Sequence, residues 1–91
     1  MAYAESGEFQ NSIRVFEKLL KEEVDNLEIL NNLGRLHKEI GTLETSINYF
    51  EKAISLNCNF HKPYIELGIL YAEQGHLKKS ISFLNKALNI K

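Results

Sequence analysis

Apolar residues recur at steps of three and four along most of this chain. One run contains Leu30, Leu33 and Ile40 with His37 between them, and comparable runs occur before and after it. Each run forms one apolar stripe on a helix, and no segment shows the sustained alternation of a half-buried strand. The pattern therefore predicts an all-α chain with a short helical remnant at 1–6. The five main helices are expected at 8–22, 27–40, 43–57, 62–74 and 77–90.

Glycines separate these runs. Gly7, Gly41 and Gly75 each follow one apolar run and precede the next. Glycine adopts the left-handed conformation that ends a helix at little cost. We therefore expect a helix to end at each of the three. The intervening connections are two to five residues long, which makes consecutive helices antiparallel neighbours.

Two further signals mark helix starts. Asp25, with Glu28 three positions later, fits an acidic variant of the capping box. Pro63, the only proline, fits the first turn of a helix, where its missing N–H leaves no hydrogen bond unmade.

The runs also repeat with a fixed period. Gly7, Gly41 and Gly75 are 34 residues apart, and other residues keep the same step. These are Ser12, Ser46 and Ser80, then Ile13, Ile47 and Ile81, and then Lys18, Lys52 and Lys86. A period of this length is typical of arrays in which each unit buries its apolar face against its neighbours.

The repeated unit resembles the tetratricopeptide repeat (TPR). It contains Leu33-Gly34 followed by His37, and later Ser46 and Phe50. One period on, these positions hold Leu67-Gly68, Tyr71, Ser80 and Leu84. The resemblance implies an α-solenoid of antiparallel helix pairs. It also divides a single domain, 1–91, into a partial repeat at 1–26 and two further repeats at 27–60 and 61–91.

Gly34 and Gly68 lie inside predicted helices, where glycine lowers helix stability by roughly 1 kcal/mol. Such glycines suggest close backbone approach. The facing residues would be Ser46 and Ser80, which are also small. We therefore expect the two helices of each unit to cross tightly at these positions.

Charge and composition exclude several function classes. The net charge is −1, and lysine and arginine form no block, so we expect no nucleic-acid partner. No apolar run is long enough to span a bilayer, so we expect no membrane partner. A single cysteine cannot form an internal disulfide, which favours a reducing compartment, and we expect a cytoplasmic protein.

Cys58 and His61 form the one spacing that suggests chemistry, Cys-x-x-His. Two ligands are too few for a structural zinc site, and neither residue has an evident orienting partner for nucleophilic catalysis. The simpler interpretation is an interhelix turn with a surface histidine. We expect no metal, no cofactor, no catalytic residue and no enzymatic activity.

The resemblance also implies where a partner would bind. In TPR proteins, the first helix of each unit lines a concave groove that holds a peptide or protein segment. The corresponding residues here are Glu28, Asn31, Asn32, Arg35, Lys38, Lys62, Ile65, Glu66 and Ile69. Ile65 and Ile69 could form an exposed apolar strip or pack against a neighbouring helix. Some TPR grooves clamp a C-terminal carboxylate, but Glu66 stands where such a clamp needs a cation.

Other roles remain open at this stage. Ile81, Leu88 and Ile90 have no following unit to cover them, which suggests self-association through the ends of the array. The most direct function is a non-catalytic protein–protein interaction scaffold. The alternatives are an oligomerisation module and a regulatory segment of a larger multidomain protein.

Overall fold

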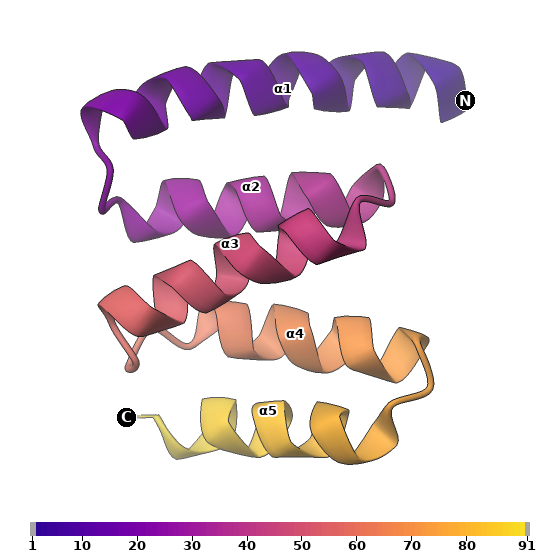
Figure 1. Ribbon diagram of the computed structural model, residues 1–91. Helices are drawn as coiled ribbons and strands as arrows, with labels where there is room; N and C mark the ends of the chain where they lie inside the picture. The colour runs from indigo at the N-terminus through magenta and orange to yellow at the C-terminus, as the bar shows by residue number, and fades with distance from the viewer. Residues whose placement is uncertain (1, 91) are drawn as a thin grey trace.

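The computed structural model describes the backbone of residues 2–90 and the side chains of residues 7–90. That part of the chain contains five α-helices and no strand, which confirms the all-α prediction (Figure 1). The helices are α1 (Ala2–Glu22), α2 (Leu27–Glu39), α3 (Leu43–Leu56), α4 (Lys62–Glu73) and α5 (Leu77–Asn89).

The helices form a stacked array in which consecutive helices are antiparallel. Figure 1 shows them in chain order from α1 at the top to α5 at the bottom, with α3 in front of α2 and α4. α2 packs most extensively on α3, and α4 packs most extensively on α5. Contacts of α4 with α3 and with α2 join these two pairs. α1 packs on α2. Each pair therefore buries its apolar stripe mainly within itself and against the next pair.

Two of the three predicted glycine turns are present. Gly41 and Gly75 have φ of 89° and 84°, in the left-handed region that favours glycine. After α2, the Thr42 N–H donates to the His37 carbonyl, and the Gly41 N–H donates to the Lys38 carbonyl. The residues after α4 repeat the same two bonds. This pattern closes each helix with a Schellman motif, so the chain reverses within three residues.

The third predicted turn is wrong. α1 continues through Gly7 from Ala2, so there is no separate helical remnant at 1–6, and Gly7 does not have a positive φ. Glycine permits a left-handed turn but does not require one, and inside a helix it costs only about 1 kcal/mol relative to alanine.

The start of α2 also differs from the prediction. The N-cap is Asn26 and not Asp25: the Asn26 side chain accepts a hydrogen bond from the Ile29 N–H at 3.0 Å. Its Nδ2 donates to Glu23 Oε1 at 3.0 Å, which holds the cap in place. Asparagine caps helices as well as aspartate does, so this additional bond favours the later start. Pro63 does lie in the first turn of α4.

The predicted tight crossings are present at both internal glycines. A Cβ on Gly34 would lie 2.5–2.7 Å from three ring carbons of Phe50, and Ser46 Oγ donates to the Gly34 carbonyl at 2.6 Å. The residue that fills the space beside Gly34 is thus Phe50, while Ser46 supplies a hydrogen bond. Gly68 faces Leu84 in the same way, at 2.6 Å.

Candidate protein-binding surfaces

The side chains predicted to line a groove come together on α2 and α4. Seven of them surround a hollow of about 280 Å³ between the two helices. The seven are Glu28, Asn31, Asn32, Arg35, Lys62, Ile65 and Glu66. Lys38 and Ile69 lie on the same two helices outside this lining. We call the nine residues together the α2/α4 surface.

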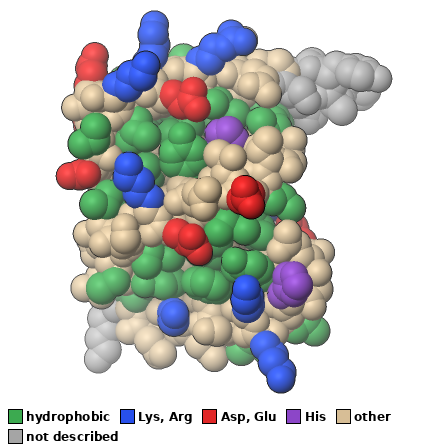
Figure 2. Space-filling model, viewed as in Figure 1, with side chains coloured by type: hydrophobic (Ala, Val, Ile, Leu, Met, Phe, Trp, Pro, Cys, Tyr) green, Lys and Arg blue, Asp and Glu red, His purple; other side chains and the backbone are tan. Residues whose placement is uncertain are grey.

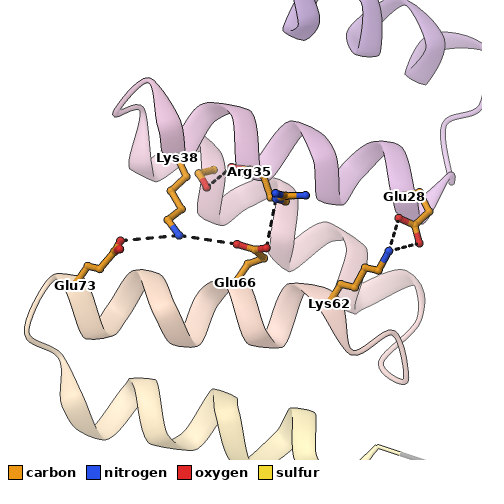
Figure 3. Close-up of polar contacts among 8 residues, drawn as sticks. Glu28, Arg35, Lys38, Lys62, Glu66 and Glu73 are labelled. Atoms are coloured by element: carbon orange, nitrogen blue, oxygen red, sulfur yellow. Dashed lines mark hydrogen bonds and ion pairs between the residues drawn. The ribbon is translucent and has the colours of Figure 1, made fainter. Parts of the chain in front are cut away.

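Ion pairs cross between α2 and α4 on this surface (Figure 3). Lys62 Nζ lies 3.1 and 3.2 Å from the two carboxylate oxygens of Glu28. Arg35 Nε lies 3.5 Å from Glu66 Oε2. Lys62, Glu28 and Arg35 are about half exposed or more, while Glu66 is 21% exposed. A solvent-exposed pair contributes about 0–1 kcal/mol, so the Lys62–Glu28 pair orients side chains more than it stabilises the fold.

Lys38 completes the network between two carboxylates. Its Nζ lies 3.9 Å from both Glu66 and Glu73, and its side chain is only 18% exposed. The sequence prediction did not include Glu73. With Glu73 counted, the surface carries three cations and three carboxylates, and each cation is paired.

Asn31 lies deeper than the sequence prediction placed it. We expected it off the core stripe, yet it is 3% exposed, and its Oδ1 has no hydrogen-bond partner among the described residues. Asn32 remains partly exposed at the hollow.

Ile65 and Ile69 are 38% and 40% exposed. They lie one helical turn apart on α4, so their side chains share one face. This exposure favours the apolar strip over the alternative in which a neighbouring helix covers both residues.

The residues proposed for self-association lie on α5. Ile81 and Leu88 are 58% and 81% exposed, whereas Ile90, just after the helix, is partly buried. Leu77 is also exposed, at the start of the same helix. α5 therefore presents apolar side chains that nothing in the described part of the chain covers.

Sequence reasoning missed a larger hollow, of about 860 Å³, between α1 and α3. Tyr49 lies in its lining, where burial and then the nearby Glu17 carboxylate raise the pKa of the Tyr49 hydroxyl. The available signal was the spacing of Arg14, Lys18 and Lys21, which puts three cations on one face of α1.

The turn that holds Cys58 has a structural role. The Tyr64 hydroxyl donates to the Cys58 carbonyl at 3.0 Å, which ties the turn to α4. Burial, followed by the nearby Cys58 thiol, raises the pKa of the Tyr64 hydroxyl. Cys58 is exposed and forms no disulfide. Within the described residues, no three histidine, cysteine or acidic side chains come close enough together to hold a metal ion.

None of the described helices is both long and apolar enough to cross a membrane.

A sequence model of the tetratricopeptide repeat matches the chain twice, at residues 27–59 and 61–91. These matches cover more than half of the chain. The chain belongs to the tetratricopeptide repeat family. TPR units generally mediate protein–protein interaction and are generally not catalytic. A comparison with curated proteins found no significant match.

Solved structures show the same TPR fold. A structure of MamA, residues 41 to the end, from Desulfovibrio magneticus RS-1 superposes with a TM-score of 0.83 at 18% identity. The match covers 91% of this chain and 47% of that one, so this chain spans about half the length of the MamA chain. A second crystal structure of MamA gives a TM-score of 0.50 at 24% identity, covering 97% of this chain and 71% of that one. These similarities establish the fold alone.

Proposed function

We propose that this TPR chain is a non-catalytic scaffold that binds a peptide or protein segment on the α2/α4 surface. The observation that carries the proposal is the hollow on that surface, which is lined from two repeats at once. A ligand there would contact both repeats. The exposed strip of Ile65 and Ile69 lies beside it and offers apolar contact.

The charge pattern defines the preferred ligand. Arg35, Lys38 and Lys62 already have carboxylate partners, so no cation of this surface is left for a C-terminal carboxylate. The partly exposed Asn32 amide can donate to and accept from a peptide backbone. A near-neutral internal segment with apolar side chains therefore fits better than a free acidic C-terminus.

We also propose a cytoplasmic location, on the basis of the one cysteine. Cys58 is exposed and unbridged, which is consistent with a reducing compartment such as the cytoplasm.

A selection from displayed random peptides tests the proposed function. Peptides that bind the parent chain should lose at least about tenfold in affinity for Ile69→Asp, because that change places a charge in the apolar strip. Asn32→Ala should lower the affinity of these peptides as well. Ile81→Asp introduces the same charge on α5 and serves as the matched control, with binding unchanged. Selected peptides that bind Ile69→Asp and the parent chain equally would place the site elsewhere.

Self-association through α5 is a second candidate function, and the exposure of Ile81 and Leu88 favours it. Covering two such side chains on a second copy would remove apolar area from water. We expect the parent chain to form dimers or larger assemblies at high concentration, and Ile81→Asp with Leu88→Asp to be monomeric. Size-exclusion chromatography with light scattering measures the mass. The Asn32→Ala variant should keep the parent's mass, and a monomeric parent chain at high concentration would contradict this candidate.

A further inference from the structure

The hollow between α1 and α3 is an open trough. It is lined by α1 and α3, whereas the α2/α4 surface belongs to the other helices of the array. Across residues 2–90, α1 and α3 do not pack on each other, since both helices pack on α2 instead. The space of about 860 Å³ between them is three times that of the α2/α4 hollow. We call this space the α1/α3 trough.

The apolar side chains of the lining, which we call the floor of the α1/α3 trough, are Val15, Leu20, Val24 and Tyr49. Val15 and Val24 of the lining are each 56% exposed, and Leu20 and Tyr49 are partly buried beside them. Figure 2 shows apolar side chains gathered beneath the basic side chains along the top of the molecule, where α1 lies. Exposed apolar surface with a polar rim is typical of an interaction site.

The walls of the trough carry positive charge on both sides. Arg14, Lys18 and Lys21 project from α1, and Lys52 comes from α3 across the trough. Glu17 is the one carboxylate in the lining. Among the side chains that the structure describes, no carboxylate lies within 4.0 Å of any of these four cations. The α2/α4 surface differs, since each of its cations is paired there.

We propose that the α1/α3 trough binds an acidic amphipathic helix from a partner protein. The apolar stripe of that helix would contact Val15 and Val24. Carboxylates on its two flanks would pair with Lys18 and Lys21 on one wall and Lys52 on the other. The lining runs along α1 from Asn11 to Lys21, which at the helical rise is about 15 Å, and Val24 extends it past the end of the helix. A helix of three to four turns fills that length.

Charge complementarity decides between this occupant and a second copy of the chain. The helix with the most exposed apolar face is α5, but it carries Lys78, Lys79 and Lys86 and no acidic residue. Four cations of the trough would repel it. A bilayer surface is also a poorer fit, because it is broad and flat while the apolar floor lies between two helical walls.

Fluorescence anisotropy with a synthetic peptide of about 14 residues tests the proposal. The peptide has leucines at helical spacing, with glutamates on both flanks of the stripe. We expect saturable binding to the 91-residue chain that weakens as salt rises from about 50 to 300 mM. Lys18→Glu with Lys21→Glu should weaken binding at least about tenfold. Lys78→Glu with Lys79→Glu changes the net charge equally on α5 and should leave affinity within about twofold.

A second variant tests the floor without changing a cation. Val15→Asp lies at an exposed position, so the chain should keep its far-ultraviolet circular dichroism while losing peptide affinity at least about tenfold. Ile69→Asp, which disrupts the α2/α4 surface, should bind the acidic peptide as the parent does. The two surfaces can therefore fail independently.

Three results would overturn the proposal. The first is equal binding of the peptide with its residues scrambled, since the stripe would then be irrelevant. The second is equal binding by the Lys18→Glu, Lys21→Glu variant and the parent. The third is absence of peptide binding together with sedimentation of the chain on vesicles that contain phosphatidylserine, which would assign the basic walls to a lipid surface.

Discussion

Replacing Phe50 with alanine should lower the unfolding free energy of the chain by about 3–5 kcal/mol. The Phe50 side chain is fully buried, and its ring fills the space beside Gly34 where α2 and α3 cross. Neither helix can close the resulting cavity easily, because the Ser46 hydrogen bond fixes their separation. Native stability is usually about 5–15 kcal/mol, so this single change removes a large share of it.

Urea unfolding followed by circular dichroism measures the loss at Phe50. Glu51→Ala is the control: Glu51 is exposed on the same helix as Phe50, and its truncation should change stability by less than about 0.5 kcal/mol. Phe50→Leu should cost less than Phe50→Ala, because the equivalent position one repeat later already holds Leu84. Equal midpoints for Phe50→Ala and the parent would show that the crossing does not depend on this ring.

Local sequence signals predicted the helices well because each helix carries its own stripe and its own end. Gly41 and Gly75 end helices as expected, and the main helices begin and end within a residue or two of the predicted bounds apart from the start of α1. Gly7 has the same sequence context but remains helical. The difference is tertiary: a turn forms where the reversal lets a complete second helix pack.

The repeat period predicts one ion pair of the α2/α4 surface. Glu28 and Lys62 are 34 residues apart, so they occupy equivalent positions in successive repeats, and the structure pairs them. Opposite charges at one position of adjacent repeats therefore predict an ion pair across the repeat boundary. The pairs of Lys38 with Glu66 and Glu73 do not keep this step, and they depend on side-chain reach.

The α1/α3 trough could not be found by pairing consecutive helices. α1 and α3 are separated by α2, and the space between them depends on how far one repeat is displaced from the next. The period predicts that the repeats stack but does not give that displacement. Only the spacing of Arg14, Lys18 and Lys21 along one helix face was visible in the sequence.

Gly34→Leu should destabilise the chain by about 2–3 kcal/mol, whereas Gly7→Leu should stabilise it by up to about 1 kcal/mol. At Gly34, the new Cβ alone would lie 2.5–2.7 Å from the Phe50 ring, and that ring is enclosed and cannot move aside. At Gly7, nothing lies within 4 Å of the new Cβ, and the helix is continuous, so leucine gains from its higher helix propensity.

Thermal or urea unfolding of the two glycine variants gives the sign of each effect. Gly68→Leu should fall between them, because the two nearest atoms that its Cβ meets belong to the partly exposed Leu84 side chain, which can shift. A double mutant that combines Gly34→Ala with Phe50→Leu should cost less than the sum of its single changes, since the smaller side chain leaves room for the new Cβ. Destabilisation by Gly7→Leu would indicate that the chain turns at Gly7 after all, and full stability of Gly34→Leu would mean that α2 and α3 do not cross tightly.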